Sequence, residues 1–207
     1  MSVNYIVRAD VIDIRQDSPK PDYIFLVDTN VWYWLTYTRA SQANQPPRTY
    51  QINDYPAYIA KALSAKSSLR SCGLSFAELA HRIEKTEKDI YIRSSGNIGS
   101  KEYRHNCSSE RTNVVAEVQA AWGQVKTMTG TVDVQVDESL TDAALLRFVT
   151  QPLDGYDLFI LEAISGAGVV KVITDDGDFV TVPGIQVFTA NLNVITAAQN
   201  QGKLIVR

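Results

Sequence analysis

Residues 157–179, DLFILEAISGAGVVKVITDDGDF, decide the fold of this chain. The part DLFILEAISGAG has the composition and length of a helix, and VVKVIT (169–174) is an apolar run of strand length. Three aspartates, Asp175, Asp176 and Asp178, follow the strand directly. Carboxylates this close repel one another unless a cation or protons neutralise them, so their place at the end of a strand needs a physical reason.

The same alternation of strand and helix continues through the rest of the chain. Further predicted strands are YIFLVD (23–28), LRSCGLS (69–75), VDVQV (132–136) and IQVFT (185–189). Predicted helices lie at 29–38, 55–66, 76–93, 101–128 and 137–151, with a polar surface loop at 41–54. This order predicts an α/β fold, a three-layer α/β/α sandwich with a central, mostly parallel sheet. The 207 residues suffice for one substantial core.

Acidic residues follow several of these apolar runs. Asp28 ends the first strand, Glu78 follows the second, Asp157 opens a helix, and Asp176 and Asp178 follow VVKVIT. Functional sites of parallel sheets lie outside the carboxyl ends of the strands. Four segments are therefore expected to bring carboxylates to one edge of the sheet.

Each acid alone also fits a purely structural role. Asp28 can cap the helix that follows it, and Ser75 with Glu78 has the S-x-x-E pattern of a capping box. Asp157 can be a favourable charge at a helix N-terminus, and the Asp-Gly pair at 176–177 is a common turn dipeptide. Together, however, such acids repel unless a cation lies among them, and an all-oxygen set suits Mg²⁺ or Mn²⁺.

Three segments together resemble the PIN-domain family, metal-dependent ribonucleases that include many bacterial toxins of the VapC type. They are FLVDTNVW (25–32), LSFAELAHRI (74–83) and YDLFILEAISGAGVVKVITDDGDF (156–179). The most specific motifs are D-T-N (28–30) at the end of the first strand and T-x-D-x-D-F (174–179) at the end of the strand VVKVIT. The resemblance covers residues 23 to about 190. It implies a PIN-like domain at 23–207 with a helical insertion around 94–128, preceded by an N-terminal extension, residues 1–22.

The resemblance also implies roles for individual residues. The metal-binding and catalytic acids would be Asp28, Glu78, Asp157 and Asp176, with Asp178 as an additional metal-binding acid. Polar side chains that orient these acids by hydrogen bonds would be Thr29, Asn30 and Thr174. Asp175 falls at a variable position of the motif and is predicted to be a turn residue that faces solvent.

The function that this resemblance implies is a Mg²⁺- or Mn²⁺-dependent endoribonuclease that hydrolyses RNA phosphodiester bonds. A toxin of a toxin–antitoxin pair would also have an antitoxin protein as partner, and the resemblance favours a homodimer. Two alternatives stay open: an inactive PIN-like binding or scaffold module, whose acids only cap helices and turns, and a structure-specific DNA nuclease with the same site.

Composition limits the other classes of function. The net charge is −3 and the pI about 5.4, which argues against a protein that coats nucleic acid through nonspecific contacts. No apolar run is long enough for a membrane span, and the first residues lack the pattern of a signal peptide. A cytoplasmic protein without a membrane partner is therefore expected.

Two groups of residues are weaker candidates for substrate binding. Lys101, Arg104 and Arg111 lie in the polar helical region and could hold phosphates, although a solvated helix face explains them as well. The aromatic run NVWYWLTYT (30–38) could stack on bases, but its rings could equally fill the core or a dimer interface.

Overall fold

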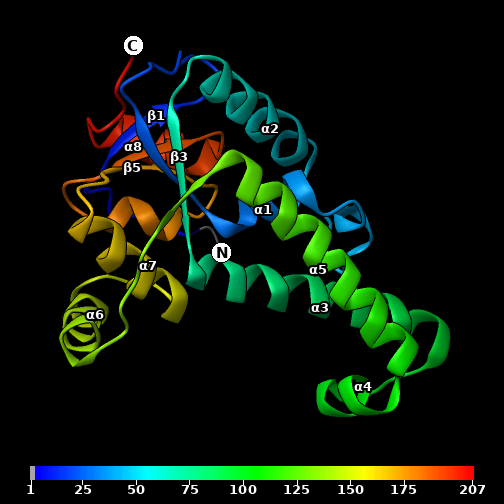
Figure 1. Ribbon diagram of the computed structural model, residues 1–207. Helices are drawn as coiled ribbons and strands as arrows, with labels where there is room; N and C mark the ends of the chain where they lie inside the picture. Colours follow the sequence, from blue (N-terminus) through cyan, green and yellow to red (C-terminus); the bar gives the residue numbers. More distant parts are fainter. Residues whose placement is uncertain (1–2) are drawn as a thin grey trace.

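The computed structural model describes residues 3–207 and contains one six-stranded sheet (Figure 1). All neighbouring strands are parallel, in the order β1-β6-β5-β2-β3-β4. The strands are β1 (Asp10–Asp13), β2 (Ile24–Val27), β3 (Ser68–Cys72), β4 (Gly130–Val132), β5 (Lys171–Ile173) and β6 (Gln186–Thr189). Because the strands are parallel, all their carboxyl ends lie at one edge of the sheet.

Helices cover both faces of this sheet, which confirms the predicted three-layer α/β/α sandwich. They are α1 (Thr29–Thr36), α2 (Thr49–Ser64), α3 (Gly73–Ser95), α4 (Ser100–Asn106), α5 (Ser108–Met128), α6 (Glu138–Thr150), α7 (Gly155–Gly166) and α8 (Leu192–Asn200). Along β2, Phe25 and Val27 pack into the core with α1 and α2, whereas Leu26 packs with α7 and α8 on the other face. Side chains of successive strand residues point to opposite faces, so this short apolar strand serves both cores.

Several elements differ from the predicted ones. The predicted loop at 41–54 is wrong at its end, since α2 already begins at Thr49, where the Gln51 side chain accepts a hydrogen bond from the Arg48 amide. The strand predicted at 132–136 is instead β4, Gly130–Val132, and pairs with β3. Pairing with β3 decides the bounds of β4, and the local apolar content of the sequence does not reveal that pairing.

The N-terminal segment contributes a strand to the sheet. Within residues 1–22, β1 pairs in parallel with β6 and buries Val11 and Ile12. The C-terminal helix α8 packs against β1 and likewise lay outside the predicted elements. A four-residue strand between charged residues carries little periodic signal. Strand β1 can therefore be recognised only from its pairing with β6.

The region 94–128 is mostly helical, as expected, but the helix predicted at 101–128 is divided at Cys107 into two helices. It holds the end of α3, the short α4 and the long α5, and α5 buries Ala121 and Val125 in the core beside α1. Helices α3 and α5 run side by side away from the sheet, and α4 lies at their outer end (Figure 1).

The aromatic run after β2 belongs to the core. Trp32, Tyr33 and Tyr37 are buried, and Trp34 is half-buried against Tyr55. Of its two interpretations, core packing is therefore the one that the structure shows. Within residues 3–207, no helix combines the length and the apolar character that crossing a bilayer requires.

Candidate metal centre

Three acids from three separate elements converge at the carboxyl edge of the sheet. Asp28 follows β2, Glu78 lies in the second turn of α3, and Asp157 lies in the first turn of α7. One carboxylate oxygen from each of them lies within 4.8 Å of the other two. The parallel topology thus brings together residues that are far apart in the chain.

Asp28 is held by the hydrogen bonds of two predicted orienting residues. Thr174 Oγ1 donates to Asp28 Oδ2 at 2.6 Å, and Asn30 Nδ2 donates to the same oxygen at 3.3 Å. The Asn30 amide donates to Asp28 Oδ1 at 3.3 Å, so Asp28 also caps α1. Thr29 is buried, and its hydroxyl has no hydrogen-bond partner within 3.5 Å in residues 3–207. It nevertheless lies close enough to Glu78 to oppose the increase in the pKa of that acid that burial causes.

Glu78 is not part of a capping box. Helix α3 begins at Gly73, and it is Ser75 that lies at the third position and accepts weakly from the Cys72 amide. One oxygen of Glu78, Oε1, is 3.9 Å from an Arg82 nitrogen, and the other, Oε2, is buried without a hydrogen-bond partner in residues 3–207. A buried acceptor without a partner is rare and needs an explanation such as a bound ion.

Asp157 is buried just inside the N-terminus of α7. The cap itself is Asp154, which accepts from the amides of Tyr156 and Asp157. Burial raises the pKa of Asp157 to about 10, and the charge of Asp28 adds to the increase. Burial likewise raises the pKa of Asp28 to about 7, helped by the charge of Glu78. These acids cannot all be ionised near neutral pH without a compensating positive charge.

Asp176 and Asp178 lie next to the three acids but outside their group. Asp176 caps the short 3₁₀-helix η2 (Gly177–Thr181) by accepting from the Asp178 amide at 2.9 Å. Its own amide donates to Thr174 Oγ1 at 2.8 Å, so Thr174 joins the Asp176 turn to Asp28. Burial and the charge of Asp176 raise the pKa of Asp178 to about 6.

Tyr5 contacts this turn, although the sequence carried no signal for it. Its ring lies against the Gly177 backbone and leaves no room for a side chain there. Burial, followed by the charges of Asp176 and Asp178, raises the pKa of Tyr5. The ring and the turn lie far apart in the sequence, and only the folded chain brings them together.

The prediction that Asp175 faces solvent is wrong. Its carboxylate is partly buried and accepts hydrogen bonds from Tyr50 (3.0 Å), Gln51 (2.6 Å) and Tyr55 (2.8 Å), all on α2. The Tyr55 hydroxyl also contacts the Thr174 carbonyl. Asp175 therefore fixes the loop after β5 to α2, a role that its neighbours along the chain cannot reveal.

Tyr55→Phe is expected to destabilise the protein by about 1–3 kcal/mol, because buried polar partners would be left unpaired. Its hydroxyl accepts from the Ala190 amide and contacts Thr189 Oγ1 besides Asp175. Urea unfolding followed by circular dichroism measures the change. Tyr50→Phe, which removes a single hydrogen bond to Asp175, is the matched control and should cost clearly less; equal costs would contradict the central role of Tyr55.

The donor set fits a hard divalent cation. Asp28, Glu78 and Asp157 offer only carboxylate oxygens, the ligands that Mg²⁺ and Mn²⁺ prefer. The unpartnered Glu78 Oε2 and the raised pKa values of Asp28 and Asp157 are both features that positive charge at this place would relieve. Asp176 and Asp178 lie close enough to add charge from the neighbouring turn.

The metal-free protein is expected to lose stability as the pH rises. The folded-state pKa values of Asp28 and Asp157 lie above those of unfolded aspartate, so the folded chain binds more protons. Stability is then greatest below about pH 4 as far as these groups are concerned, and it declines towards about pH 10. Thermal unfolding in EDTA across this range measures the decline, and saturating Mn²⁺ should suppress it. A flat profile in EDTA would contradict the prediction.

The cationic candidates lie away from the three acids. Lys101 and Arg104 are on α4 at the outer end of the helix pair (Figure 1), and Arg104 forms an ion pair with Glu84. Arg111 lies on α5 and lines a groove between α3 and α5. Of these three cations, Arg111 is the one that lines this groove.

Comparison with known proteins adds no relative: no protein-family model matches the chain, and no curated protein matches it.

Proposed function

We propose that this chain is a PIN-like, Mg²⁺- or Mn²⁺-dependent endoribonuclease that uses Asp28, Glu78 and Asp157 as metal ligands, with Asp176 and Asp178 beside them. The observation that carries the proposal is the convergence of the first three acids, with a buried Glu78 oxygen that has no hydrogen-bond partner within 3.5 Å in residues 3–207. The motifs around Asp28 and Asp176 supply the resemblance to ribonucleases.

A divalent cation at this place would offset the charge of a phosphodiester and lower the pKa of an attacking water. The chain's own residues prepare the site. Thr174 and Asn30 fix the Asp28 carboxylate in one orientation. Mutation of residues that hold a metal ligand in this way typically lowers metal affinity or activity about 10- to 100-fold. Burial of Asp28 and Asp157 keeps water from screening their charges.

Calorimetric titration with Mn²⁺ tests the metal site first. We expect saturable binding by the wild type and none by a Glu78→Gln variant with an intact circular dichroism spectrum. Acids that only cap helices and turns would give no saturable heat, which is the result expected of an inactive scaffold and would overturn the proposal.

Cleavage assays then test the substrate. A labelled single-stranded RNA should be cut in Mn²⁺ and left intact in EDTA, and a DNA of the same sequence should be cut more slowly. Preference for structured DNA would overturn the ribonuclease and favour the DNA nuclease with the same site. The resemblance also suggests a toxin with an antitoxin partner, and a homodimer. Growth arrest on expression tests the toxin, and light scattering tests the homodimer.

A further inference from the structure

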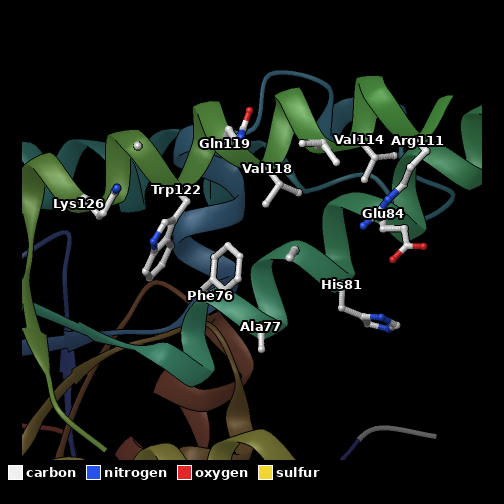
Figure 2. A pocket seen from close by; sticks show the side chains of 13 residues that line it. Phe76, Ala77, His81, Glu84, Arg111, Val114, Val118, Gln119, Trp122 and Lys126 are labelled. Carbon is white, nitrogen blue, oxygen red and sulfur yellow. The ribbon is translucent and has the colours of Figure 1, made fainter. Parts of the chain in front are cut away.

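A groove of about 680 Å³ lies between α3 and α5 (Figure 2). Phe76 and Trp122 face each other in it, with ring centroids 5.3 Å apart and planes at 60°. Phe76 is 41% exposed and Trp122 half-buried, so both rings present surface to the groove. These are accessible aromatic rings, in contrast to the buried ones that follow β2.

Helix α3 contributes residues both to the groove and to the metal centre. Phe76 precedes Glu78 by two residues, so the two side chains differ by about 3 Å along the helix axis and by about 200° around it, and Glu78 is not part of the groove lining. The exposed residues Ala77 and His81 line the groove on the same helix. A flexible chain bound in the groove would have to pass around α3, over Ala77 and His81, to reach Glu78.

Two cations that form no ion pair within residues 3–207 line the groove. Arg111 and Lys126 on α5 line the groove, and residues 3–207 place no carboxylate within 4 Å of their nitrogens. The one groove glutamate, Glu84, is paired with Arg104. Lys126 lies one helical turn from Trp122, whereas Arg111 lies at the other end of the groove, next to Glu84 (Figure 2). In a chain of net charge −3, exposed aromatic rings with cations along the same groove suit an anionic, aromatic ligand.

We infer that this groove binds the unpaired bases of a single-stranded polynucleotide, with a base against Phe76 and Trp122 and phosphates near Arg111 and Lys126. Aromatic faces with interspersed cations are the usual means of holding single strands, because unstacked bases offer a free face. Bases inside a duplex are already stacked and cannot enter. The inference rests on the proposed function and specifies its substrate as an unpaired strand.

Binding in EDTA separates the groove from catalysis. Fluorescence anisotropy of a labelled single-stranded RNA should show about tenfold or greater weakening in Phe76→Leu and in Trp122→Leu, the usual effect of losing one stacked base. Lys126→Gln should weaken binding less and reduce its salt dependence. The matched controls are Phe148→Leu, an exposed aromatic on α6, and Lys61→Gln on α2, which should bind as the wild type does.

Gly123→Leu tests the groove without removing any contact. Gly123 lines the groove on α5, and a Cβ there meets no atom within 4 Å, so leucine would project into open space. Leucine also favours a helix more than glycine does, so lost binding would not come from a weakened fold. We expect at least about tenfold weaker single-strand binding with an unchanged or higher Tm.

The outcomes separate the two proposals. If the wild type cleaves RNA while Phe76→Leu, Trp122→Leu and Gly123→Leu bind the single strand within about twofold of wild type, the groove is not a base-binding site and the inference fails alone. Equal binding of duplex and single strand would also overturn it. Absence of Mn²⁺ binding and of cleavage, with groove variants that still lose RNA affinity, would instead overturn only the proposed function.

Discussion

Asp28→Asn is expected to lower Mn²⁺-dependent RNA cleavage by about 10³-fold or more while the fold is retained. Asparagine keeps the shape and can still cap α1 through its side-chain oxygen. It removes the negative charge that would hold a cation. Asp28 is the acid whose carboxylate Thr174 and Asn30 orient by hydrogen bonds. Initial cleavage rates in Mn²⁺, with circular dichroism as a check of folding, measure the effect.

The matched control for this substitution is Asp10→Asn. Asp10 begins β1 and therefore lies at the opposite edge of the same sheet, away from the three acids. The control has the same change in net charge, so it should cleave RNA at the wild-type rate. Full activity in purified Asp28→Asn would contradict the assignment of Asp28 as a metal ligand and, with it, the proposed metal centre.

The fold could be predicted from sequence because its central strands and helices carry strong local patterns. YIFLVD and VVKVIT are apolar runs of strand length that are buried on both faces, and they became β2 and β5. The acids at the ends of such strands were expected at one edge, and Asp28, Glu78 and Asp157 do meet there.

Features that depend on tertiary partners could not be predicted. Strand β1 is defined by its pairing with β6, and Asp175 by three donors on α2. The apparent capping box at Ser75 and Glu78 failed for a similar reason, since the actual start of α3 at Gly73 shifts both residues inside the helix. Local motifs specify which groups are available, whereas packing decides which of them meet.

The structural alternatives for the acids partly coexist with the metal centre. Asp28 and Asp176 each accept an amide hydrogen bond at a helix start, as a capping role requires. Capping does not explain Glu78, whose Oε2 has no hydrogen-bond partner within 3.5 Å among the described residues, or Asp157, because Asp154 is the cap of α7. Glu78 and Asp157 are therefore the residues at which the capping-only and metal-binding interpretations differ most.

Asp157→Asn is expected to raise the Tm of the metal-free protein and to abolish its increase with Mn²⁺. Near neutral pH, folding of the wild type in EDTA must keep a proton on Asp157 that the unfolded chain releases, because burial and the charge of Asp28 raise its pKa to about 10. Asparagine is neutral at every pH and avoids this cost. The gain should be several degrees at about pH 8 and vanish towards about pH 4.

The response to Mn²⁺ should change in the opposite direction. A cation at about 100 times its Kd stabilises the wild type by about 2.7 kcal/mol, which is about 5–10 °C for a domain of this size. The variant lacks one of three ligands and should show almost none of this shift, whereas Asp142→Asn on the exposed face of α6 should behave as the wild type does. If Asp157 served only as a charge at the start of α7, asparagine would lower the metal-free Tm and leave the Mn²⁺ response intact. The two roles therefore predict opposite signs in EDTA, so one thermal series decides between them.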